Sequence, residues 1–153
     1  MVRLTDLPET EAKHLLALQC PQFDDSPFAQ GPALKEARVA LITSAGLARR
    51  SDSTFRAGAA DYRVIPGDIA AGDLVMSHVS TNYDRSGFAQ DLNVVFPIDR
   101  LREMAADGTI GSAAKYHYSF MGATEPEALE ESARQLAGLL KEDGVNAVFF
   151  TPV

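Results

Sequence analysis

Side chains that can do chemistry are concentrated in one stretch of the sequence, residues 78–91. The stretch follows a short apolar run of strand length, Leu74 to Met76. It carries an imidazole, an amide, a phenol, two carboxylates and a guanidinium, on His78, Asn82, Tyr83, Asp84, Arg85 and Asp91. Because ligands of open parallel sheets bind outside the carboxyl ends of the strands, we expect a binding site here. The alternative is an ordinary solvated loop.

These residue types suggest specific roles. His78 and Asp84 could act as an acid and a base, because imidazole changes charge near neutral pH. Tyr83 and Arg85 could bind a carboxylate, Arg85 through its bidentate fork. Asp84 and Asp91 could orient a cationic amine, although Asp also caps loops in Asx-turns. The spacing of His78, Asp84 and Asp91 matches no compact metal-ligand motif, so we expect no metal ion.

Strand ends elsewhere in the sequence offer further candidates. Backbone amides there could meet a carboxylate, or the residues could form plain turns; these residues are Ser44, Gly46 and Thr151. The G-x-G-x-x-G spacing is absent, which disfavours a dinucleotide site. His117 lies between Tyr116 and Tyr118 and should point to the opposite face of its strand, either into the core or into the site.

The composition is typical of a globular protein and excludes some classes of function. The 153 residues carry 14 Lys and Arg against 21 Asp and Glu, a net charge of −7, so we expect no nucleic-acid partner. No apolar run approaches the roughly 20 residues of a membrane span, and the N-terminus lacks signal-peptide features. We therefore expect a cytoplasmic protein without a membrane partner. The single cysteine, Cys20, excludes an internal disulfide and an all-thiolate metal site within one chain.

Strands alternate with helices along the chain, which predicts an α/β fold. We expect a single domain at residues 37–153, with a largely parallel sheet flanked by helices in Rossmann-like layering. Residues 1–36 should form a helix and a proline-rich arm. The predicted strands are 38–46, an edge strand at 61–66, an inner strand at 73–78, and strands at 116–121 and 145–153. Helices are predicted at 97–106 and after 124–127, which reads as a capping box.

Four blocks of the sequence, 37–46, 77–84, 91–101 and 117–122, resemble the selenoprotein B family of glycine, sarcosine, betaine and D-proline reductases. The resemblance runs from about Ala37 to Val153, and its most specific blocks are 91–101 and 117–122. It implies a reductase subunit whose substrate is a small amino acid or N-methylated amine. It also implies protein partner subunits or a thiol redox donor, and it favours a place for His117 in the site.

The resemblance implies a redox residue as well. In this family a selenocysteine, or a cysteine in many relatives, attacks the α-carbon side of a substrate activated elsewhere, and a nearby thiol resolves the adduct. That residue is expected just after a strand ending in Thr-Pro-x, which here is Phe149 to Val153. We therefore expect selenocysteine or cysteine immediately after Val153 in a full-length protein. A selenocysteine codon is otherwise read as stop, so we expect a chain truncated there and inactive by itself in reduction.

Two other functions remain open at this point. The chain could be a non-catalytic small-molecule-binding or assembly subunit, or an isomerase or lyase that uses His78 and Asp84. The uncovered last strand and the arm also make a homo-oligomer plausible. Coordinates that place Val153 far from His78 and Asp84 would contradict the reductase hypothesis.

Overall fold

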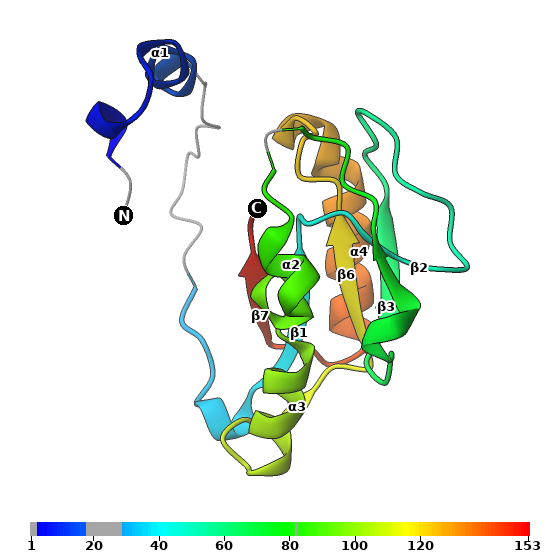
Figure 1. Ribbon diagram of the computed structural model, residues 1–153. Coiled ribbons are helices and arrows are strands. Elements are labelled where there is room, and N and C mark those ends of the chain that lie inside the picture. The colour runs from blue at the N-terminus through cyan, green and yellow to red at the C-terminus, as the bar shows by residue number, and fades with distance from the viewer. Residues whose placement is uncertain (1–2, 18–28, 82) are drawn as a thin grey trace.

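The computed structural model describes residues 3–17, 29–81 and 83–153. The described residues form four α-helices and seven strands, with short 3₁₀ turns between them (Figure 1). The helices are α1 (Glu9–Ala17), α2 (Ser86–Gln90), α3 (Ile98–Ala106) and α4 (Glu130–Glu142). The strands are β1 (Arg38–Thr43), β2 (Leu47–Arg49), β3 (Tyr62–Pro66), β4 (Leu74–Met76), β5 (Ser112–Ala113), β6 (Tyr116–Phe120) and β7 (Ala147–Thr151).

Strand β1 is the centre of the main sheet, as its continuous apolar run predicts. It pairs in parallel with β7 along residues 39–43. On its other side it pairs in parallel with β5 at residues 38–39 and with β6 at residues 42–43. Strand β3 then pairs with β6 in the antiparallel direction. The α/β prediction and the edge position of β3 are confirmed, but the sheet is mixed rather than largely parallel.

The inner strand predicted at 73–78 does not join this sheet. Instead β4 pairs with β2 in a separate antiparallel ribbon. The chain turns sharply after β1 at Gly46, whose φ is +64°, and this turn leads β2 away from the sheet. The prediction was wrong because a three-residue apolar run cannot show which strand it pairs with.

The two faces of the sheet are covered by different helices (Figure 1). Val39 and Leu41 of β1 pack in a cluster with Ile98 and Leu101 of α3. Their neighbour Ile42 points the other way and packs in a second cluster that includes Leu136 of α4, together with Tyr118 and Phe120. This layering confirms the helices predicted at 97–106 and after residue 124.

The N-terminal part of α4 differs from the capping box predicted at 124–127. Glu125 precedes a 3₁₀ turn at Pro126–Leu129, and no side chain caps it. The hydroxyl of Thr124 donates instead to the carbonyl oxygen of Ala59, at 2.8 Å. Thr124 therefore binds a residue distant in the sequence instead of forming the predicted capping box. At the other end of the chain, helix α1 buries none of its residues and lies apart from the sheet (Figure 1).

Strand β7 confirms the strand predicted at 145–153 and lies at one edge of the main sheet. Phe149 and Phe150 point to opposite faces of it and are 53% and 66% exposed. An apolar groove of about 390 Å³ lies between β7 and α4, and another of about 450 Å³ lies between β7 and α3. Among the described strands, β7 pairs only with β1.

Arg38 joins the beginning of β1 to the end of α4. Its guanidinium donates to a carboxylate oxygen and to the carbonyl oxygen of Asp143, both at 2.6 Å. It also donates to the carbonyl oxygen of Ala113 in β5 at 2.9 Å. The other carboxylate oxygen of Asp143 accepts from the amide of Lys115. One partly buried ion pair therefore fixes three elements against one another.

Replacing Arg38 by Ala should destabilise the fold by about 2–3 kcal/mol, because hydrogen bonds to partly buried charged groups are lost together. Urea denaturation measures this loss. The matched control is Arg134→Ala, which removes an exposed pair with Glu130 one helical turn away and should cost about 0.5 kcal/mol at most. Equal costs for the two variants would contradict the structural role of Arg38.

Candidate functional site

The carboxyl ends of three parallel strands meet at one edge of the sheet, around Ser44. The amide of Ser44, directly after β1, donates to the carbonyl oxygen of Thr151 in β7. The carbonyl oxygen of Ser44 accepts from the amide of Gly122, two residues after the end of β6. A Cβ atom on Gly122 would lie 2.7 Å from that oxygen, so only glycine permits this approach. The strand ends are thereby held together by backbone contacts.

The hydroxyl of Ser44 holds the end of the chain at the same edge. It accepts from the amide of Val153 at 2.9 Å and lies 3.4 Å from the carbonyl oxygen of Val153. Thr151 is fixed from the opposite direction, since its hydroxyl donates to the carbonyl oxygen of Val95 at 2.7 Å. Ser44 and Thr151, both candidates from the sequence, therefore lie at this edge, where their hydroxyl groups bind backbone atoms of other segments.

Gly46 brings the segment that follows β4 to this edge. Its carbonyl oxygen accepts from the amide of Ser77 at 2.8 Å. A Cβ atom at Gly46 would lie only 3.0 Å from the Cα and amide nitrogen of His78. The backbone of His78 thus rests directly on a left-handed glycine, which fixes where the imidazole begins.

A pocket of about 250 Å³ lies where these segments converge. The residues that line it come from the loop after β4, the turn after β6 and the segment after β7: His78, Ser80, Tyr83, Gly122, Ala123 and Val153. Val153 and His78 therefore line one pocket, whereas Asp84, which the reductase hypothesis also expects near Val153, does not line it. Sequence reasoning missed Ser80, Gly122 and Ala123, although 117–122 was among the most specific blocks.

His78 is 8% exposed and is held in one orientation. Its Nδ1 atom accepts from the amide of Ser80 at 3.2 Å, so in the neutral ring the proton is on Nε2. Nε2 is buried and has no hydrogen-bond partner among the described residues. Burial, and secondarily the charge of Arg85, lower the pKa of His78, so the ring is neutral at pH 7.

Tyr83 lies beside His78, with the ring centroids 4.8 Å apart. Its hydroxyl is also buried without a partner among the described residues. Burial raises the pKa of Tyr83, so the phenol keeps its proton at neutral pH.

Arg85 does not offer the free fork that the sequence suggests for carboxylate binding. One terminal nitrogen donates to the carbonyl oxygens of His78 and Ser80, both at 2.8 Å. The other donates to the carbonyl oxygen of Tyr83 at 3.2 Å. Arg85 therefore shapes the loop by binding its backbone, and its charge remains close to His78 and Tyr83.

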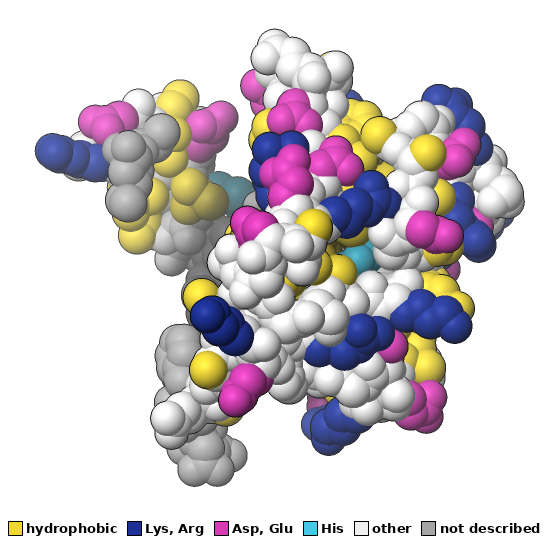
Figure 2. Space-filling model, turned by 90° about the horizontal axis from the view of Figure 1, so that it is seen from below, with side chains coloured by type: hydrophobic (Ala, Val, Ile, Leu, Met, Phe, Trp, Pro, Cys, Tyr) yellow, Lys and Arg dark blue, Asp and Glu magenta, His cyan; other side chains and the backbone are white. Residues whose placement is uncertain are grey.

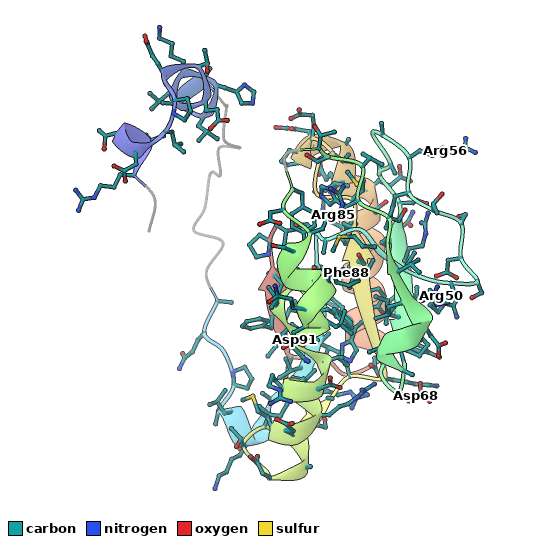
Figure 3. The ribbon with its side chains drawn as sticks, viewed as in Figure 1. Arg50, Arg56, Asp68, Arg85, Phe88 and Asp91 are labelled. Carbon is teal, nitrogen blue, oxygen red and sulfur yellow. The ribbon has the colours of Figure 1, made fainter. Side chains whose placement is uncertain are left out.

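The two predicted carboxylates bind nearby backbone. Asp84 accepts from the amide of Ser86 at 2.9 Å, and that hydrogen bond lowers the pKa of its exposed carboxyl group. Asp91 accepts from the amide and side chain of Asn93, and its pKa is lowered in the same way. Figure 3 shows Arg85 near the start of α2 and Asp91 at the far end of that helix. Neither carboxylate lines the pocket.

His117 and Asn82 complete the set of predicted residues. His117 is fully buried on the α3 side of the sheet, where its Nδ1 accepts from the amide of Leu41 at 3.0 Å and its ring packs edge-on against Phe96. The structure does not place it on the pocket with His78. Its role is to satisfy an amide of the central strand. Asn82 lies outside the described residues.

The described part of the chain contains no group of three His, Cys, Asp or Glu side chains placed to hold a metal ion. None of its helices combines the length and apolar character that crossing a bilayer requires. On the face shown in Figure 2, basic and acidic side chains are interspersed.

Comparisons with known proteins identify one family for this chain. Residues 10–153 match the family model described as glycine/sarcosine/betaine reductase selenoprotein B. The D-proline reductase subunit gamma of Acetoanaerobium sticklandii is 40% identical over 121 residues, which cover 77% of this chain and 49% of that protein. The glycine reductase complex component B subunit gamma of Carboxydothermus hydrogenoformans is 32% identical over 144 residues, 88% of this chain and 32% of that protein.

A third relative is the sarcosine reductase complex component B subunit beta of Peptoclostridium acidaminophilum, 32% identical over 142 residues, which cover 86% of this chain and 31% of that protein. The chain thus spans about half the length of the D-proline reductase subunit and about a third of the other two. No solved structure matches the chain significantly.

Substituting Gly46 by Ala should destabilise the fold by roughly 2–3 kcal/mol and displace His78, because the added methyl group meets the backbone of His78 at a left-handed position. Gly58→Ala is the matched control. Gly58 has φ +70° but nothing within 4 Å of an added Cβ, so only the backbone cost of about 1 kcal/mol applies. Urea denaturation and the NMR signals of the His78 ring measure both effects. Equal costs with an unmoved His78 signal would contradict this contact.

The buried His117 should make the fold sensitive to mild acid. Burial, with a smaller effect from Arg102, lowers its pKa from 6.5 to about 4. The unfolded chain therefore binds a proton near pH 6.5 that the folded chain does not bind until about pH 4. The free energy of unfolding should have its full value above about pH 6.5 and should fall by up to roughly 3 kcal/mol as the pH drops to 4.

Urea denaturation at a series of pH values measures this dependence. In His117→Asn the amide oxygen can still accept from Leu41, and most of the dependence between pH 6.5 and 4 should disappear. His14→Asn, on the exposed surface of α1, should keep it. An unchanged pH profile in the His117 variant would refute the assignment.

Proposed function

Because the chain belongs to the glycine/sarcosine/betaine reductase selenoprotein B family, we propose that it forms part of a reductase for a small amino acid or N-methylated amine. The candidate substrates are glycine, sarcosine, betaine and D-proline. In this proposal the pocket of His78, Tyr83 and Val153 receives a selenocysteine or cysteine that immediately follows Val153 in a full-length protein.

The observation that carries the proposal is the position of Val153. Ser44 binds both backbone groups of Val153, and Val153 lines the pocket together with His78 and Tyr83. A residue attached to Val153 would therefore begin at the pocket wall. The pocket, at about 250 Å³, suits a ligand of a few heavy atoms such as a small amino acid.

The polar groups around the pocket fit an anionic sulfur or selenium atom. A selenol or thiol supplies a nucleophile and, with an external thiol, the two electrons of a reduction. Arg85 provides a positive charge that is close enough to lower the pKa of His78. The same charge would favour a thiolate or selenolate over its protonated form.

In this proposal the reducing equivalents come from an external thiol. Cys20 is the only cysteine, and it lies outside the described residues. We therefore propose a thiol redox donor, and partner subunits of a reductase complex, in the cytoplasm. A homo-oligomer also remains a proposal.

The alternative functions receive less support. An isomerase or lyase that uses His78 and Asp84 needs the two groups to face one substrate, but Asp84 binds the amide of Ser86 and does not line the pocket. A non-catalytic binding subunit could use the same pocket, and it would require no activated thiol.

A cysteine appended after Val153, in a Cys20→Ser background, should have a pKa below the usual value of about 8.5. The physical reason is the nearby charge of Arg85. The rate of alkylation by iodoacetamide as a function of pH measures this pKa. Arg85→Gln should return it toward the usual value, whereas Arg134→Gln, at an exposed site on α4, should leave it unchanged.

An ordinary or raised pKa of the appended thiol would count against the proposal and favour the binding subunit. Mass spectrometry of the protein from its natural source gives a second check. A peptide that continues past Val153 with neither selenocysteine nor cysteine would remove the proposed redox residue.

A further inference from the structure

Two side chains of the pocket have buried polar atoms without partners. Among the described residues, only three buried side-chain polar atoms lack a hydrogen bond, and two of them are Nε2 of His78 and the hydroxyl of Tyr83. The third belongs to His117, away from the pocket. A buried polar atom left unpaired is unfavourable by about 1–3 kcal/mol. Two such atoms on adjacent rings therefore indicate a site built to bind something.

Both atoms are hydrogen-bond donors at neutral pH. The amide of Ser80 occupies Nδ1 of His78, which leaves the proton on Nε2. The phenol of Tyr83 stays protonated because burial raises its pKa. No hydrogen bond joins the two groups, although their ring centroids are 4.8 Å apart. Their natural complement is an acceptor with two oxygen atoms.

The surroundings favour a negatively charged acceptor. No acidic side chain lines the pocket, and Asp84 is exposed and bound to the amide of Ser86. Arg85 adds a positive charge, with its guanidinium carbon 5.7 Å from the centre of the Tyr83 ring. Because three backbone carbonyl oxygens occupy Arg85, it acts on a ligand through its field and not by direct contact.

We propose that Nε2–H of His78 and the hydroxyl of Tyr83 form a subsite that binds the carboxylate of a small amino acid or betaine. The choice of ligand class rests on the proposed function, whereas the pair of donors does not. Tyr83 is only partly buried, and the proposal includes a rotation of its side chain that exposes both donors to the pocket. The rest of the ligand would extend toward Val153 and the turn at Gly122.

Ligands that differ only in the carboxylate test this subsite on the unmodified 153-residue chain. Betaine is compared with choline, and D-proline with D-prolinamide, by NMR of the histidine side-chain nitrogens. The carboxylates should shift the Nε2 signal of His78, and choline and D-prolinamide should not. The signals of His14 and His117 serve as internal references and should stay in place.

Removing one donor should weaken the binding of the carboxylates. In Tyr83→Phe only the hydroxyl is lost, and the dissociation constant for betaine or D-proline should rise by about tenfold or more. Tyr116→Phe is the matched control, because Tyr116 lies at the opposite end of β6 and outside this pocket. Unchanged His117 signals establish that each variant is folded.

Several results would overturn the subsite: equal binding of betaine and choline, a Tyr83→Phe variant that binds as tightly as the original chain, or no shift at His78 with any carboxylate. A bound water molecule satisfying both donors without any response to carboxylates would also refute it. If the appended thiol has a lowered pKa but carboxylates do not bind, only the carboxylate subsite is refuted. If carboxylates bind but the appended thiol has an ordinary pKa, the subsite is supported and the proposed redox role is refuted.

Discussion

Parallel pairing of β1 with β5, β6 and β7 is the constraint on which the structure depends. It brings the carboxyl ends of β1, β6 and β7 to one edge, where the backbone of Ser44 binds both neighbouring chains. The ion pair of Arg38 and Asp143 fixes the opposite end of β1. Because both ends of the central strand are fixed, the sheet sets the positions of the segments that line the pocket, and short loops complete it.

The periodicity of apolar residues predicted those helices and strands whose own sequence shows a clear apolar pattern. The continuous apolar run of β1 and the helical spacing of α4 are examples, and both were located correctly. Periodicity could not give the direction of β3 or the partner of β4, because pairing depends on residues distant in the chain. The pairing of β4 with β2 follows from the turn at Gly46, whose left-handed backbone no spacing rule reveals.

The candidate site was predicted as a region more accurately than as a set of roles. His78 and Tyr83 do line a pocket with Val153, but Asp84 and Asp91 bind neighbouring amides and Arg85 binds carbonyl oxygens. Residue type alone could not separate these outcomes, since a carboxylate or guanidinium suits a ligand and a loop backbone equally well. Gly122 and Ala123 were missed because they contribute shape and carry no functional group.

The open edge of β7 affects how this chain behaves in solution. Among the described residues no strand pairs with its outer edge, and Phe149 and Phe150 lie on its two faces, so other chains could build a fibril-like sheet on it. No charged residue interrupts residues 147–151, so mutual repulsion from the net charge of −7 is the main protection. Since about 0.1 M salt screens charges beyond roughly 10 Å, concentrated samples should be kept at low ionic strength.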